Sequence, residues 1–271
     1  MAERLGLDDV GGFVFDVDGT LVLRGPDGRG APQPGAVEVI ERIHASGRPL
    51  MLFTNGSHVG AGVIARGLQE DGLPIAEDEV MTPIESATTY LLRRHAGRPV
   101  MLFTSQAIRE QMAREGIQVS DADDAEAVFV AHVDRADFDA MERAARAVSR
   151  GAPLLTGSYV RGYAGANGII FSRGAMVTAA IAKVTGARPR VLGKPSRAAV
   201  AEMGRRLGVP TERLAMIGDD LSMDVVLGRM GGSRTVLVRS GISGPLELES
   251  IPPRQRPDAV IDGVADLLAM L

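Results

Sequence analysis

Two aspartates separated by a single residue follow a short apolar segment near the start of the chain. Residues 13–18 are Phe-Val-Phe-Asp-Val-Asp, and Gly19 and Thr20 come next. The apolar residues predict a buried parallel strand, and open α/β sheets place their chemistry at the carboxyl ends of such strands. Asp16 and Asp18 would lie close together there, which is unfavourable unless a cation or a shared proton relieves their repulsion. An ordinary strand end with two solvated acids is the alternative.

A second apolar segment that ends in carboxylates lies near the other end of the sequence. Residues 214–217 predict the strand, and Asp219, Asp220 and Asp224 follow it. Clusters of oxygen ligands without cysteine suit a hard cation such as Mg²⁺. The alternative is a helix N-terminus with acidic residues that interact favourably with the helix dipole.

Two further motifs carry groups that could bind an anion. Thr54 and Asn55 follow a predicted strand, where a hydroxyl and a backbone N–H could hold a phosphate oxygen; a common turn composition is the alternative. Lys194 and Pro195 lie at the start of a predicted helix. We expect Pro195 in the first turn of that helix and Lys194 at its N-terminus, where the lysine adds a point charge for an anion. A solvated lysine is the alternative.

The elements that must position these motifs alternate between strand and helix. The predicted strands are a first one ending at Asp16 and residues 49–53, 100–103, 127–130, 153–155, 169–171, 214–217, 235–238 and 259–261. The predicted helices include residues 34–47, 84–94, 106–114, 136–150 and 195–207, with a short helix at the end of the chain. This alternation favours parallel sheets with helices on both faces.

The middle third of the chain has its own set of predicted strands. We therefore expect an inserted α/β domain at residues 79–191, and a doubly wound parallel-sheet α/β core formed by residues 1–78 and 192–271. The core is discontinuous in sequence, and all four motifs belong to it.

Composition limits the class of protein. The 271 residues are 45% hydrophobic and 24% charged, as in ordinary globular proteins. The net charge is −4 with dispersed lysine and arginine, so nothing indicates nucleic-acid binding. The absence of cysteine excludes disulfides, thiolate nucleophiles and cysteine-ligated zinc. No pattern of a signal peptide or membrane span is present, so we expect a cytoplasmic protein with no membrane partner.

The four motifs, in this order, resemble those of the haloacid-dehalogenase (HAD) superfamily of phosphohydrolases over nearly the whole chain. Residues 193–195, Gly-Lys-Pro, and 218–224, Gly-Asp-Asp-Leu-Ser-Met-Asp, are similar to the NagD-like, nitrophenylphosphatase-type branch, class IIA. The inserted segment resembles the larger α/β cap of that superfamily. The resemblance implies a Rossmann-like core and Mg²⁺-dependent hydrolysis of small phosphorylated metabolites, such as a nucleoside monophosphate, a sugar phosphate or a short phosphorylated acid. It also allows a homodimer through the cap.

The resemblance implies catalytic roles for the aspartates. Asp16 would be the nucleophile that forms an aspartyl-phosphate, and Asp18 would protonate the leaving oxygen and then activate water. Asp16, Asp219 and the backbone carbonyl of Asp18 would hold Mg²⁺, which offsets the repulsion between the nucleophile and the phosphate.

The same resemblance assigns the remaining motif residues to binding. Thr54, the Asn55 backbone and Lys194 would bind the transferring phosphoryl oxygens, which makes Lys194 a catalytic residue as well. Asp224 would anchor Lys194 or a metal-bound water from outside the metal's ligands. Asp220 would have a secondary role.

One cap segment departs from the family pattern. Where many relatives have Thr-Asn-x-Asp, residues 156–159 are Thr-Gly-Ser-Tyr, and a glycine-rich, flexible stretch follows. Tyr159, Arg161 and Tyr163 could face the active site and select the substrate, with Arg161 meeting an anionic group. A tight cap turn with packed tyrosines is the alternative.

Two other functions share these motifs. A phosphotransferase or mutase would use the same aspartyl-phosphate chemistry with a different acceptor. A noncatalytic module that binds a phosphorylated metabolite is less favoured, because both aspartates of the first motif are present. Dehalogenation is disfavoured, because Asp18 supplies an acid that the dehalogenase branch generally lacks.

Overall fold

The computed structural model describes residues 6–24, 30–165, 168–243 and 251–271, in two compact units. The first unit comprises Met1–Thr54, Ala61–Met81 and Pro195–Leu271, and the second comprises Asn55–Gly60 and Thr82–Lys194. Residues 55–60, which the sequence prediction assigned to the core, thus cluster with the second unit. That the second unit is an inserted cap stays a prediction.

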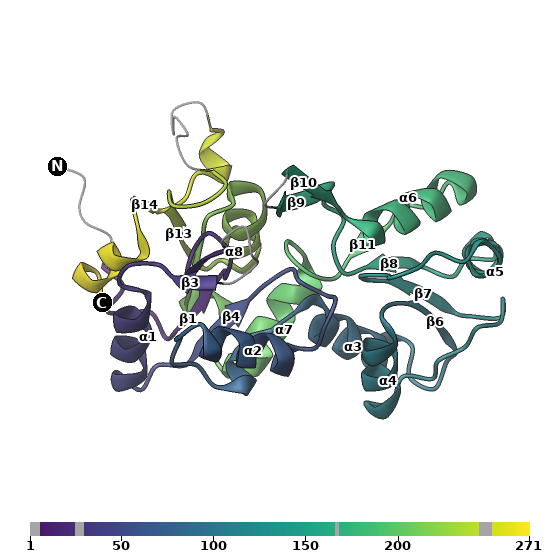
Figure 1. The fold of residues 1–271 in the computed structure, drawn as a ribbon, viewed down its shortest axis with the longest axis horizontal. Coiled ribbons are helices and arrows are strands. Elements are labelled where there is room, and N and C mark those ends of the chain that lie inside the picture. The colour runs from purple at the N-terminus through teal and green to yellow at the C-terminus, as the bar shows by residue number, and fades with distance from the viewer. Residues whose placement is uncertain (1–5, 25–29, 166–167, 244–250) are drawn as a thin grey trace. The chain divides into compact units, whose positions relative to one another are not determined.

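A six-stranded sheet lies at the centre of the first unit (Figure 1). Its strands are β1 (Gly12–Phe15), β4 (Leu50–Phe53), β5 (Val80–Met81), β12 (Leu214–Gly218), β13 (Arg234–Val238) and β14 (Ala259–Ile261). The order is β14-β13-β12-β1-β4-β5, and every neighbouring pair is parallel. The chain extends from β1 through β4 and β5 on one side, and later through β12, β13 and β14 on the other. The order therefore reverses between β1 and β12, and open α/β sheets bind ligands at such a point.

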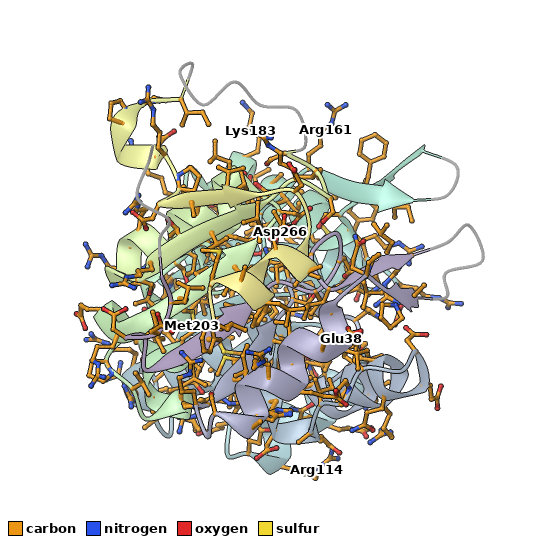
Figure 2. The ribbon with its side chains drawn as sticks, turned by 90° about the vertical axis from the view of Figure 1, so that its left-hand side faces the viewer. Glu38, Arg114, Arg161, Lys183, Met203 and Asp266 are labelled. Atoms are coloured by element: carbon orange, nitrogen blue, oxygen red, sulfur yellow. The ribbon has the colours of Figure 1, made fainter. Side chains whose placement is uncertain are left out.

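Both faces of this sheet are covered, because alternate side chains of each strand enter different cores. Phe13 and Phe15 of β1 belong to one core cluster, whereas Val14 between them belongs to another. The helices are α1 (Ala36–Ala45), α2 (Ala61–Glu70), α7 (Arg197–Leu207) and α8 (Val226–Gly231). Helix α1 contributes buried Ile40 to the first cluster. Helix α7 contributes buried Met203, which is labelled in Figure 2, to the second. This arrangement confirms the predicted doubly wound α/β core.

The second unit contains a smaller parallel sheet of its own, in the order β11-β8-β7-β6. Its strands are β6 (Val100–Phe103), β7 (Ala127–Val130), β8 (Leu154–Thr156) and β11 (Arg190–Val191). Its helices are α3 (Pro83–Arg94), α4 (Gln106–Arg114), α5 (Phe138–Ser149) and α6 (Arg173–Thr185). An antiparallel hairpin of β9 (Gly162–Gly165) and β10 (Gly168–Phe171) completes the unit. The predicted α/β character of the middle third is confirmed.

Several short strands differ from the sequence-based expectation. Strand β9 lies in the stretch that was predicted to be flexible; it pairs with β10. In the first unit, β2 (Val22–Arg24) and β3 (Gly30–Pro32) form an antiparallel hairpin directly after the first motif. These strands were missed because segments of three or four residues are too short to show apolar alternation, and β3 and β9 also contain glycine or proline. No helix in the described ranges has the length and apolarity needed to cross a bilayer.

Candidate active site

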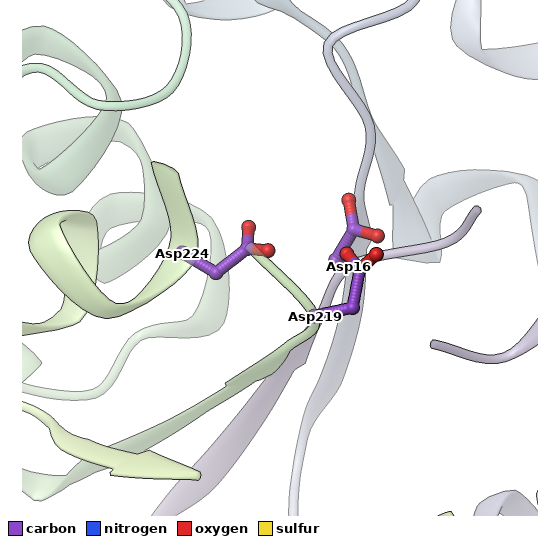
Figure 3. A group of neighbouring side chains, drawn as sticks. All are labelled: Asp16, Asp219 and Asp224. Carbon is purple, nitrogen blue, oxygen red and sulfur yellow. The ribbon is translucent and has the colours of Figure 1, made fainter. Parts of the chain in front are cut away.

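Three of the predicted carboxylates come together at the carboxyl edge of the six-stranded sheet. Asp16 follows β1 and Asp219 follows β12, and the register pairs Phe15 with Ile217 across these neighbouring strands. Asp224 belongs to the helical turn that begins after Asp219. One oxygen from each of the three aspartates lies within 4.8 Å of the other two (Figure 3).

The cluster fits a hard divalent cation. Ligands of an octahedral Mg²⁺ at about 2.1 Å from the metal lie roughly 3–4 Å from one another, so the observed spacing needs little adjustment. All three donors are carboxylate oxygens. The side chains of Asp219 and Asp224 are buried, at 6% and 1% exposure. Because buried like charges repel strongly, a cation among them would stabilise the arrangement.

Two glycines leave the space that the Asp219 carboxylate occupies, because a side chain at either position would clash with it. A Cβ atom would lie 2.4 Å from Asp219 Oδ2 at Gly19 and 1.9 Å from it at Gly241. Gly19 also has a φ of 92°, which favours glycine. The backbone N–H of Ile242 donates a hydrogen bond to the same oxygen, at 2.7 Å. The backbone thus both admits and orients this carboxylate.

Substitution of Gly241 tests this arrangement. Gly241→Ala is expected to weaken Mg²⁺ binding by roughly tenfold or more, because overpacking costs about 1–3 kcal/mol and the new methyl group must displace the Asp219 carboxylate. Calorimetric titration of the purified variant with Mg²⁺ measures the change. Gly67→Ala is the matched control, since a Cβ atom there meets nothing within 4 Å. Equal Mg²⁺ affinities for the Gly241 variant and the control would contradict the requirement for glycine beside the Asp219 carboxylate.

Asp220 and Asp224 shape the turn after β12. The Asp220 carboxylate caps this turn by accepting hydrogen bonds from the backbone N–H groups of Ser222, at 2.7 Å, and Met223, at 3.2 Å. The backbone N–H of Asp220 donates to Asp224 Oδ2, at 3.1 Å. A Cβ atom at Gly218 would lie 2.3 Å from Asp224 Cγ, so glycine is required there. These hydrogen bonds keep the Asp224 carboxylate near Asp16 and Asp219.

Asn55 and Lys194 are joined by two hydrogen bonds in the second unit. The Lys194 backbone N–H donates to Asn55 Oδ1 at 2.9 Å, and Asn55 Nδ2 donates to the Lys194 carbonyl at 3.2 Å. Lys194 is 3% exposed, and burial of an ammonium group is unfavourable without anionic or polar partners. Thr54 belongs to the first unit and follows β4, the other neighbour of β1, so it lies at the same sheet edge as Asp16.

The start of α7 differs from the expectation. Pro195 lies before the helix instead of in its first turn, so that prediction was wrong. Ser196 is the N-cap, and its hydroxyl accepts a hydrogen bond from the Ala199 backbone N–H at 3.0 Å. Serine is a strong N-cap residue, and with Ser196 as the N-cap the helix begins at Arg197, two residues after Pro195.

Asp18 is not one of the residues of the carboxylate cluster. Its side chain is half exposed and forms an ion pair with Arg24, with Nε and Oδ1 2.6 Å apart. Sequence reasoning missed Arg24, because the β2–β3 hairpin that carries it was not predicted.

The predicted specificity residues lie in and before the β9–β10 hairpin. Tyr159 is 44% exposed, which disfavours the packed-tyrosine alternative at this position. Arg161 is exposed, and its guanidinium carbon lies 5.7 Å from the centre of the Phe171 ring (Figure 2). Tyr163 is in β9, opposite Ile170, and its side chain lies outside the described part of the chain.

Comparison with protein families gives the same assignment for both ends of the chain. Residues 13–118 match the haloacid dehalogenase-like hydrolase model, and residues 191–267 match the HAD-hydrolase-like model. The chain belongs to the HAD-like hydrolases. The matched segments contain every aspartate of the cluster. The sequence between them, residues 119–190, belongs to the second unit.

Individual relatives of this HAD-like hydrolase are phosphatases. It is 27% identical over 257 residues to the ribonucleotide monophosphatase NagD of Escherichia coli K12, covering 94% of this chain and 96% of NagD. It is 28% identical over 261 residues to the dihydroxyacetone phosphatase of Corynebacterium glutamicum strain R, covering 94% and 90% of the two chains.

The solved structure of a p-nitrophenyl phosphatase from Archaeoglobus fulgidus matches with a TM-score of 0.85 at 26% identity, covering 97% of this chain and 100% of that one. The predicted NagD-like phosphatase branch and the predicted fold class are thereby confirmed.

Proposed function

We propose that this HAD-like phosphatase hydrolyses small phosphate monoesters with Mg²⁺, by way of a phosphoryl group carried on Asp16. The cluster of Asp16, Asp219 and Asp224 carries this proposal, since it joins a strand-end nucleophile to a set of hard-cation ligands. Relatives named for ribonucleotides, dihydroxyacetone and acid sugars support a nucleoside monophosphate, sugar phosphate or short phosphorylated acid as substrate.

The two aspartates of the first motif would divide the chemistry. The Asp16 carboxylate attacks phosphorus, and the bond to the leaving oxygen breaks as Asp18 gives that oxygen a proton. Asp18 then takes a proton from water, which attacks the acyl phosphate and releases phosphate and free Asp16. Mg²⁺, held by Asp16, Asp219 and the Asp18 carbonyl with Asp224 beside them, would reduce the repulsion between the carboxylate and the phosphate.

The remaining motif residues would bind the phosphoryl oxygens. We propose that the Thr54 hydroxyl, the Asn55 backbone N–H and the Lys194 ammonium donate to these oxygens, which become more negative as the leaving group departs. The paired hydrogen bonds between the Asn55 side chain and the Lys194 backbone support this, because they join the two residues that carry these donors. Asp220 would act only by capping the turn that presents Asp224.

Chemical trapping tests the covalent step directly. Borohydride reduces an aspartyl-phosphate to homoserine, so reduction during turnover, followed by peptide mass spectrometry, is expected to find homoserine at position 16. Position 18 should remain aspartate, and enzyme reduced without substrate is the control. Full turnover with aspartate unmodified at both positions would contradict the covalent route, and homoserine at position 18 would exchange the two roles.

We also propose that the second unit is an inserted cap that selects the leaving group. Tyr159→Ala and Arg161→Ala are expected to change the ratio of kcat/KM between the best natural ester and nitrophenyl phosphate by more than about twofold, because a side-chain contact to the leaving group is worth up to a few kcal/mol. Arg98→Ala removes an exposed arginine elsewhere in this unit and serves as the control. Ratios within about twofold of wild type would assign these residues to structure alone.

Two accompanying expectations have separate tests. Competing alcohols in the assay would reveal phosphotransfer as phosphorylated alcohol, which distinguishes a transferase from a hydrolase. A homodimer formed through the second unit stays a prediction, which sedimentation of the purified chain measures.

A further inference from the structure

Among the described residues of the β2–β3 hairpin, Arg24 alone has an ion pair with a residue of the first motif, which is Asp18. Its Nε atom lies 2.6 Å from Asp18 Oδ1, which is hydrogen-bonding distance. The two side chains are 44% and 52% exposed, so neither is held in place by burial. The hairpin returns the chain toward Asp18 only six residues after it.

Hydrogen bonds and buried side chains anchor the backbone between the two residues. The N–H groups of Leu21 and Val22 both donate to the Val17 carbonyl, at 2.9 and 3.0 Å, and the Gly19 N–H donates to the Val22 carbonyl at 2.8 Å. Val17, Leu21 and Val22 are almost completely buried. Because this turn is anchored by buried residues, the backbone positions of Asp18 and Arg24 are set by the fold. The relative placement of their exposed side chains then depends on their rotamers.

We propose that Arg24 is a positioning residue, which holds the Asp18 carboxyl group in the orientation from which it exchanges a proton with the leaving oxygen. This inference rests on the proposed function, in which Asp18 is the proton donor. An exposed aspartate samples several rotamers, and a guanidinium with its planar set of N–H donors favours one of them. The effect of the charge itself is screened at this exposure, so orientation is the main contribution.

A series of leaving groups separates this role from others. An ester with a poor leaving group, such as an alkyl phosphate, needs the proton from Asp18, whereas dinitrophenyl phosphate departs without it. Arg24→Ala is expected to lower kcat/KM about fivefold for the alkyl phosphate, and by less than about twofold for dinitrophenyl phosphate. Arg24→Lys should recover part of the loss, because it keeps the charge without the planar fork.

A double-mutant cycle identifies the group through which Arg24 acts. In the Asp18→Asn background, Arg24→Ala is expected to have no further effect on the alkyl ester, since the oriented group is already gone. Arg66→Ala, which removes another exposed arginine, paired with Glu77, should match wild type with both esters.

The outcomes distinguish this inference from the function on which it rests. Equal losses for both esters would assign Arg24 to phosphate binding and overturn the positioning role, and so would additive effects in the cycle. If Asp18→Asn itself affects both esters equally, the proton-donor role of Asp18 in the proposed function is wrong. If Asp18→Asn is selective and Arg24→Ala is not, only the positioning role falls.

Discussion

Asp16→Asn is expected to retain less than about a hundredth of the wild-type rate while keeping the native fold. The amide has nearly the shape of the carboxylate but cannot form the acyl phosphate, so the covalent route is lost. The variant also removes one of three clustered negative charges, so its unfolding temperature without metal should not fall. Steady-state kinetics and thermal unfolding monitored by circular dichroism measure the two effects.

Asp262→Asn provides the matched control for that experiment. It makes the same chemical change at an exposed residue, whose partner is Arg239, and should leave the rate unchanged. A native Asp16→Asn protein that turns over at more than about a hundredth of the wild-type rate would assign the nucleophile to another group.

Removal of divalent metal is expected to abolish hydrolysis, and added Mg²⁺ is expected to restore it. The physical reason is the charge of the cluster, whose oxygen ligands bind hard cations and whose carboxylates otherwise repel the substrate phosphate. A ligand that binds only the folded state at a hundred times its Kd stabilises that state by about 2.7 kcal/mol. Mg²⁺ should therefore also raise the unfolding temperature of the metal-free protein by several degrees.

The stability readout makes the metal prediction independent of catalysis. The Mg²⁺-induced rise in unfolding temperature should be lost in Asp219→Asn and retained in Asp262→Asn. Full activity after confirmed metal removal would refute the metal-dependent mechanism, and an equal rise in the Asp219 variant would place the bound ion elsewhere.

Most of the core could be predicted because its elements have strong periodicity. Buried strands such as Val100–Phe103 and Ala127–Val130 are apolar runs between turn residues, and the structure has them at the predicted residues. The β2–β3 hairpin could not be predicted in this way. Its order depends on backbone hydrogen bonds to residues of the preceding turn, which leave no repeating pattern in the sequence.

The candidate site divides along the same line. The meeting of Asp16 and Asp219 follows from two strand ends in one parallel sheet, which sequence patterns indicate. The close approach of Asp224 depends on a helical turn capped by Asp220 and on the missing Cβ atom of Gly218, and neither is a periodic feature. Arg24 could not be assigned to Asp18 without the hairpin that brings them together.

The order of strands in the six-stranded sheet has a consequence for how the protein matures on the ribosome. Strand β1 is made early, but β12, its neighbour on the side opposite β4, is made only after the entire second unit has been synthesised. Until then, that edge of β1 has no strand to pair with, and unpaired apolar strand edges are the sites at which nascent chains aggregate or recruit chaperones. The three-aspartate cluster likewise cannot exist before β12 has docked. The cluster therefore forms late in folding, and a chain interrupted anywhere before residue 214 would carry Asp16 without Asp219 and Asp224.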